Sequence, residues 1–130
     1  MLRLCDDGFE VQLETGGSFD IGAVDSRVKR IVDFKSPSSK MMKNNVWKNI
    51  DHLTSRDEVK FVIGNREDYE WAKRMIEQYR IPARCPVLMS VTFGVLDPLT
   101  LTNWVLADRL DVRFQLQMHK YVWAPETKGV

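Results

Sequence analysis

The side chains with the greatest potential for chemistry gather in one segment near the end of the sequence. Residues 110–123 read LDVRFQLQMHKYVW. Side chains of an extended strand alternate between two faces, so the polar ones in this segment share a face. They are Arg113, Gln115, Gln117 and His119. A cation, two amides and an imidazole in one row could bind a polar ligand, although an ordinary amphipathic strand with a solvated outer face explains the same pattern.

Two earlier stretches also carry potential ligand-binding groups. Residues 14–17 read ETGG, where glycines would let the backbone approach a ligand closely. Residues 35–39 read KSPSS, and a lysine, hydroxyl groups and a helix N-terminus could together form a pocket for an anion or a carboxylate. A plain turn explains the first stretch equally well, and a serine-rich helix cap beside a solvated lysine explains the second.

The elements that must position these residues alternate between strand and helix. We expect strands at 9–13, 29–35, 58–63 and 87–91 and a fifth beginning near Val112, with helices at about 44–53 and 65–79 and a third beginning at Asp97. This order predicts an α/β fold with a parallel sheet of about five strands. In such a sheet the ligand lies beyond the carboxyl ends of the strands. The stretches at 15–18, 35–39 and 117–120 fall there, together with Thr92.

Composition limits the classes of protein to which the chain could belong. The sequence has 130 residues, with 19 basic and 18 acidic side chains. This length suits a single domain, 1–130, and the balanced charge gives no reason to expect nucleic acid or an acidic membrane as a partner. No apolar run reaches the length of a membrane span, and the first residues lack the apolar core of a signal peptide. We expect a globular cytoplasmic protein.

Four stretches together resemble a known family. Residues 14–17 (ETGG), 33–39 (DFKSPSS), 57–63 (DEVKFVI) and 113–123 (RFQLQMHKYVW) are similar, in this order, to 7-carboxy-7-deazaguanine synthase, a radical SAM enzyme family of queuosine and deazapurine biosynthesis. The resemblance runs from about residue 9 to the last residue. It covers only the C-terminal part of the family's fold, so it implies the second half of an incomplete radical SAM barrel.

The resemblance implies roles for particular residues. Thr15, Gly16, Lys35 and Ser38 would help to bind S-adenosylmethionine, although Gly16 stands where the family usually has a serine. Gln117 and His119 would lie near the substrate, 6-carboxytetrahydropterin. The complete family enzyme also uses a [4Fe-4S] cluster and a magnesium ion. We assign no metal ligand and no catalytic residue within these 130 residues, and we expect no cofactor to bind tightly to the chain alone.

The cysteines set a limit on activity. The family holds its cluster with a Cys-x3-Cys-x2-Cys loop, whereas this sequence has only two cysteines, Cys5 and Cys85, far apart. We therefore expect the chain to be inactive by itself and to need a cluster-binding N-terminal half: either that half is a separate polypeptide or the chain is a truncated product. The alternative is a non-catalytic half-barrel that forms a homodimer or pairs with such a half through its exposed strand edges. A metal-free acid–base enzyme built on His119 is a weaker third hypothesis, because the sequence identifies no acid partner.

Overall fold

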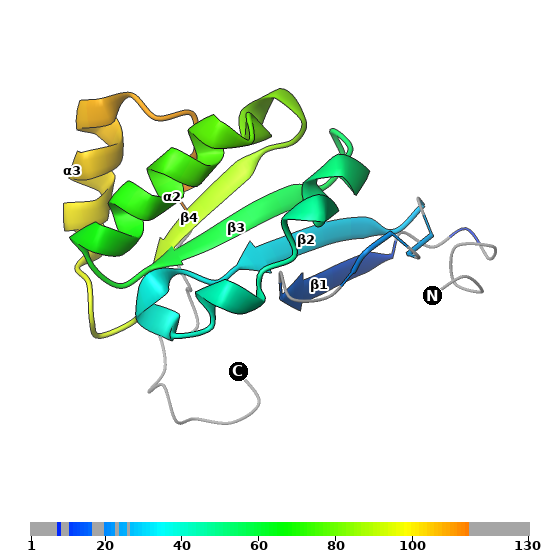
Figure 1. Cartoon of the computed structure of the whole chain (residues 1–130). Helices are drawn as coiled ribbons and strands as arrows, with labels where there is room; N and C mark the ends of the chain where they lie inside the picture. The colour runs from blue at the N-terminus through cyan, green and yellow to red at the C-terminus, as the bar shows by residue number, and fades with distance from the viewer. Residues whose placement is uncertain (1–7, 9–10, 17–19, 23, 26, 115–130) are drawn as a thin grey trace.

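The computed structural model describes residue 8 and residues 11–16, 20–22, 24–25 and 27–114 (Figure 1). Its strands form one sheet in the order β1-β2-β3-β4-β5, and every neighbouring pair is parallel. The strands are β1 (Gln12–Gly16), β2 (Lys29–Phe34), β3 (Glu58–Ile63), β4 (Val87–Val91) and β5 (Arg113–Phe114). The predicted α/β fold with a five-stranded parallel sheet is therefore confirmed.

Two α-helices follow the third and fourth strands, as their capping residues predict. Helix α2 (Arg66–Gln78) begins after Asn65, whose side-chain oxygen accepts a hydrogen bond from the backbone N–H of Asp68. Helix α3 (Pro98–Asp108) begins after Asp97, whose carboxylate accepts from the backbone N–H of Leu99. The two helices pack against each other through Tyr69 and Trp104, whose ring centroids lie 5.4 Å apart. Both therefore cover the same face of the sheet (Figure 1).

The helix expected at about 44–53 is wrong in kind. The chain forms short 3-10 segments there. Ser36, which was expected to cap the helix, makes no side-chain cap and instead donates its hydroxyl to the carbonyl of Val62. Asn45 both accepts from the N–H of Lys35 and donates to its carbonyl, at 2.9 Å each, and such side-chain bonds compete with an α-helix. The 3-10 segments are η1 (Pro37–Ser39), η2 (Met42–Asn44), η3 (Trp47–His52) and, before β4, η4 (Ile81–Ala83).

The first strand lies further along the chain than its alternating pattern predicts. Thr15 and Gly16 belong to β1, where they pair with Val32 and Asp33, instead of forming the turn that a glycine pair favours. The pairing with β2 outweighs the local preference of glycine, because it provides backbone hydrogen bonds that a free turn would lack.

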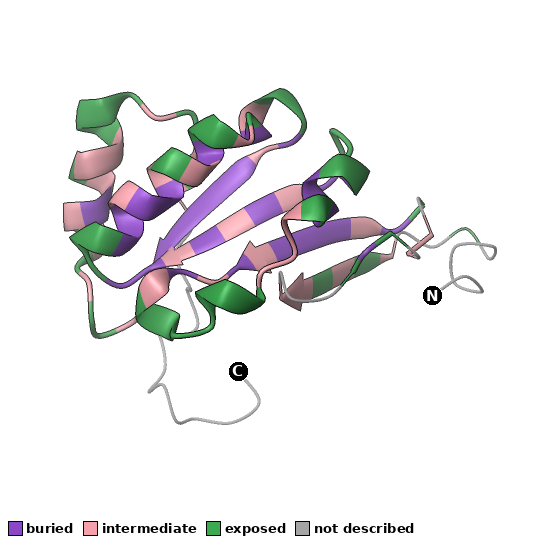
Figure 2. Ribbon diagram, viewed as in Figure 1, coloured by how far each residue is buried: buried purple, intermediate pink, exposed green. Residues whose placement is uncertain are grey.

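The core lies between the sheet and the helices (Figure 2). Phe34, Phe61 and Met89 form a fully buried row across β2, β3 and β4, with relative exposures of 0%. The Trp47 ring lies between Phe34 and Tyr79, at centroid distances of 4.5 and 4.9 Å, and so joins η3 to the sheet and to α2. Among the described residues, no helix has the length and apolar character needed to cross a membrane.

Candidate functional site

The segments that follow β2, β3 and β4 meet around Gly64. A β-carbon at this position would lie 3.0 Å from Ser38 Oγ, 3.2 Å from Asp68 Oδ2 and 3.3 Å from Thr92 Oγ1. Gly64 itself is buried, and it ends β3. Its missing side chain therefore lets two hydroxyl groups and a carboxylate approach one point. We call these residues (Ser38, Gly64, Asp68 and Thr92) the hydroxyl cluster.

Lys35 and Asp33 form an ion pair at the carboxyl end of β2, shortly before Ser38 in the sequence. The ammonium of Lys35 is 3.1 Å from Asp33 Oδ2, and its side chain remains 40% exposed. The other carboxylate oxygen, Asp33 Oδ1, is buried and has no hydrogen-bond partner. A buried acceptor without a donor is costly, so this oxygen is suited to receive a donor from a bound molecule.

A second group of polar side chains lies on the sheet face away from the helices. Asp33 and Lys60 are neighbours in the strand register there, and Lys60 extends toward Glu14 of β1, with 3.7 Å between the ammonium and the carboxylate. The Lys60 side chain is only 13% exposed, so it lies along this face and does not extend into solvent. Ser90 of β4 adds a buried hydroxyl without a partner. These groups could hydrogen-bond to a polar ligand on this face.

The predicted ligand-binding residues fall into three groups. Lys35 and Ser38 lie on one loop, as expected, with Ser38 exposed. Thr15 and Gly16 end β1, and the pairing of Gly16 with Asp33 brings them next to that loop. Gln117 and His119 lie outside the described residues.

Sequence reasoning missed Asp68 and Ser90. An acidic residue three positions after a capping Asn65 has the pattern of a helix cap, so the sequence offered no sign that the Asp68 side chain reaches Ser38. Ser90 stands in an otherwise apolar strand and has the pattern of a core residue. The one available signal was the presence of a polar residue within a strand whose other residues are all apolar.

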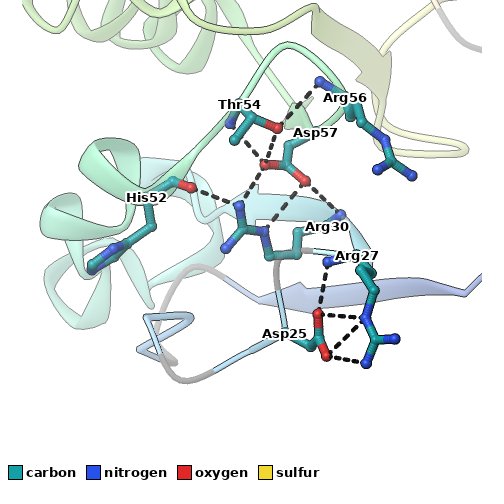
Figure 3. Close-up of polar contacts among 7 residues, drawn as sticks. All are labelled: Asp25, Arg27, Arg30, His52, Thr54, Arg56 and Asp57. Atoms are coloured by element: carbon teal, nitrogen blue, oxygen red, sulfur yellow. Dashed lines mark hydrogen bonds and ion pairs between the residues drawn. The ribbon is translucent and has the colours of Figure 1, made fainter. Parts of the chain in front are cut away.

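At the amino ends of β2 and β3, a buried ion pair between Arg30 and Asp57 joins the two strands (Figure 3). We call this pair the Arg30–Asp57 anchor. The Arg30 guanidinium bonds to both oxygens of Asp57, with Nη2 2.8 Å from Oδ2, and to the carbonyl of His52. Thr54 donates its backbone N–H and its hydroxyl to the same carboxylate. Burial opposes the ionisation of Asp57, but the hydrogen bonds from Arg30 and Thr54 outweigh it and lower the pKa of that carboxyl.

The fit of the family's cofactors to these residues differs from one cofactor to another. S-adenosylmethionine carries amino and hydroxyl donors, and the unpartnered Asp33 oxygen and the hydroxyl cluster are suitable acceptors for them. An iron–sulfur cluster needs thiolates, whereas burial and nearby acidic residues raise the pKa of the Cys85 thiol to about 12. Cys85 also precedes β4, so it lies at the amino ends of the strands, away from the hydroxyl cluster at their carboxyl ends. In the part of the chain that the structure describes, no group of three or more His, Cys, Asp or Glu could hold a metal ion.

Comparison with known proteins finds several relatives that share one name. The 7-carboxy-7-deazaguanine synthase of Chlorobaculum tepidum is 43% identical over 130 residues, covering 98% of this chain and 59% of that protein. The 7-carboxy-7-deazaguanine synthase of Koribacter versatilis is 41% identical, with 100% and 63% covered. That of Clostridium acetobutylicum is 28% identical, with 96% and 58% covered. No protein-family model matches the chain.

The chain thus spans about three fifths of the length of these curated relatives. Its parallel sheet agrees with a partial barrel. Over nearly its whole length the chain is thus similar to 7-carboxy-7-deazaguanine synthases, and its extent is consistent with the C-terminal part of such a protein.

Proposed function

We propose that this chain forms the C-terminal wall of a radical SAM 7-carboxy-7-deazaguanine synthase, which converts 6-carboxytetrahydropterin to 7-carboxy-7-deazaguanine with loss of ammonia. The observation that carries the proposal is that Thr15, Gly16, Lys35 and Ser38 all lie at the carboxyl ends of β1 and β2. The chain that places them there is similar to 7-carboxy-7-deazaguanine synthases. In that role Lys35 and Ser38 bind S-adenosylmethionine, and Gln117 and His119 bind the pterin.

Each polar group has a defined task in this proposal. The exposed ammonium of Lys35 attracts the cofactor's carboxylate, and Asp33 Oδ1 accepts from one of its donors. The [4Fe-4S] cluster of the complete enzyme would supply an iron to which the amino and carboxylate groups of S-adenosylmethionine could bind. The two cysteines of these 130 residues do not provide its three thiolates, so the cluster-binding loop must come from a segment or partner outside them.

The test is a reconstitution with iron and sulfide, followed by turnover with S-adenosylmethionine, a reductant and 6-carboxytetrahydropterin. We expect product only when the cluster-binding N-terminal half of a family member is added. We expect turnover to fall by about tenfold or more in each of three variants, Lys35→Ala, Gln117→Ala and His119→Ala. Lys48→Ala, at an exposed lysine of η3, should leave it unchanged. Product from the chain alone would contradict the need for a second half, and no product in either case would contradict the proposed activity.

A non-catalytic half-barrel is the second candidate. Strand β1 ends the strand order of the described sheet and pairs there with β2 alone. An edge strand of this kind presents backbone groups that can pair with another chain. A homodimer, or a complex with a separate N-terminal half, would satisfy them, and the absence of product in the reconstitution would favour this candidate.

A further inference from the structure

Asp68 is a fully buried carboxylate, with 0% exposure, in the first turn of α2. It accepts three hydrogen bonds. The backbone N–H of Ser38 lies 2.9 Å from Oδ1, the backbone N–H of Gly64 lies 2.8 Å from Oδ2, and the Ser38 hydroxyl also donates to Oδ2. The carboxylate therefore joins the loop after β2 to the end of β3.

This use of Asp68 differs from ordinary helix capping. An acidic residue at the third helical position usually bonds back to the N–H of the capping residue, which here is Asn65. Asp68 instead bonds to Gly64 and, across 30 positions of sequence, to Ser38. Hydrogen bonds to an ionised acceptor are stronger than neutral ones, so Asp68 fixes both the backbone and the hydroxyl of Ser38.

The bond from the hydroxyl decides what Ser38 can offer to a ligand. A serine hydroxyl has one hydrogen to donate and two lone pairs that accept. Its hydrogen is already directed at Asp68, and Ser38 as a residue is exposed to solvent. Toward a small molecule that contacts it, the Ser38 hydroxyl can therefore only accept.

We propose that Asp68 is a positioning residue that presents Ser38 to the cofactor as an acceptor only, so that Ser38 selects a donor group of S-adenosylmethionine. This inference rests on the proposed function, which places Ser38 in the cofactor site. The donors available on the cofactor are its ammonium, its ribose hydroxyls and its adenine amino group. A carboxylate is excluded from this position, since two acceptors would face each other.

Asp68→Asn tests the proposal with little change in shape. Asparagine replaces one oxygen by an NH2 group, and because each oxygen of Asp68 accepts a backbone N–H, one of those bonds is lost. With the NH2 group at the Oδ2 position, the Ser38 hydroxyl turns to accept from it and its hydrogen becomes free to point outward. The binding preference of Ser38 is then reversed, and we expect the affinity for S-adenosylmethionine to fall about five- to tenfold. Glu67→Gln is the matched control, because it removes the same charge from an exposed position on the same helical turn and should change nothing.

The measurement is a ¹⁵N NMR titration of the complete chain with S-adenosylmethionine to millimolar concentration, with thermal denaturation as a check of folding. Wild type, Asp68→Asn, Ser38→Ala and the double variant form a cycle. Both single variants should weaken binding, and Asp68→Asn should have no further effect once Ser38 is alanine. An equal loss in both backgrounds would overturn the inference and leave the proposed function standing. Absence of any wild-type titration would overturn the inference, while the proposed function is judged separately by turnover with the added N-terminal half.

If Asp68→Asn does not fold, cofactor analogues test the same point. Wild type and Ser38→Ala are titrated with three analogues of S-adenosylmethionine that lack, in turn, the ammonium, the ribose hydroxyls and the adenine amino hydrogens. One analogue should bind equally to both proteins, because it lacks the donor that Ser38 accepts. The inference is overturned if all three still distinguish Ser38 from alanine.

Discussion

Arg30 and Asp57 show how a single buried ion pair can hold two strands together. Their side chains are only 5% and 2% exposed, and the carboxylate also accepts the backbone N–H groups of Arg30 and Thr54. Removing one partner leaves the other charge buried without compensation. The pair therefore matters more through the cost of breaking it than through its net contribution to stability.

We expect Asp57→Ala to lower the free energy of unfolding by about 3–5 kcal/mol at neutral pH, because Arg30 would remain buried without its carboxylate. Urea denaturation followed by circular dichroism measures the loss. Asp25→Ala is the matched control, since Asp25 pairs with Arg27, whose side chain is 47% exposed. Equal effects of the two substitutions would show that burial does not set the cost.

The same carboxylate makes stability depend on pH. The pKa of Asp57 is lower in the folded chain than its ordinary value of 3.8, so the unfolded chain binds more protons when the pH falls below that value. The stabilisation is thus present above the ordinary pKa and is lost as the pH falls through the folded one. The difference in unfolding free energy between wild type and Asp57→Ala should therefore shrink on acidification below about pH 4. A constant difference would contradict this linkage.

Cys85 should be inert in the folded chain. With its pKa raised to about 12 by burial and neighbouring acidic groups, the thiolate fraction at pH 8 is on the order of one in ten thousand. In a Cys5→Ser variant, iodoacetamide should label Cys85 only after unfolding in urea, as read by mass spectrometry. Labelling of the native chain at the rate of a free thiol would show that Cys85 is accessible and ionised.

At the scale of elements, Trp47 holds the 3-10 segment η3 against two other elements. Trp47→Ala removes the ring between Phe34 and Tyr79 and should lower the free energy of unfolding by about 3 kcal/mol. Trp47→Phe keeps a ring in the stack and should lose less than half of that amount. Urea denaturation of both variants gives the comparison, and an equal loss would mean that the stack itself contributes nothing.

Strands and α-helices could be predicted because their signals are local. The apolar end of the strand Glu58–Ile63 and the caps Asn65 and Asp97 each act within a few residues, and the structure contains the strand and both caps. The region after Ser36 could not be predicted, since its conformation depends on Asn45 bonding back to Lys35. No periodicity records such a bond.

The site could be predicted only in part, for a related reason. Lys35 and Ser38 lie close in sequence and reach the expected edge together. Asp68 comes to that edge because β2 and β3 are neighbours in the sheet, and this neighbourhood sets the contact across 30 residues. Sequence spacing shows which residues share a loop, whereas strand order decides which loops meet.

At the scale of the whole molecule, the side of β1 that faces away from β2 predicts association, because no other described strand pairs with it. The carbonyl of Val11 accepts from the N–H of Lys29, so by the alternation of a parallel ladder the N–H of Gln12 points away from β2. We expect the chain to elute as a dimer, and Gln12→Pro to shift it to a monomer because proline removes that outward donor. Size-exclusion chromatography with light scattering measures both.

Leu13→Pro provides the contrast, because the N–H of Leu13 faces β2. It should destabilise the fold, whereas Gln12→Pro should leave the melting temperature nearly unchanged. A wild-type monomer at all concentrations would contradict pairing through β1.

The Arg30–Asp57 anchor lies at the amino ends of the strands, and the hydroxyl cluster lies at their carboxyl ends. Because the two groups share no residue, most substitutions in the loop that carries Ser38 should leave the anchor intact. Libraries that randomise residues 37 and 39 should therefore contain many folded members, whereas Ser36, which is buried and donates to the Val62 carbonyl, should be kept. Asp68 sets the boundary of that freedom, so directed evolution toward new cofactors should succeed more often when it is left unchanged.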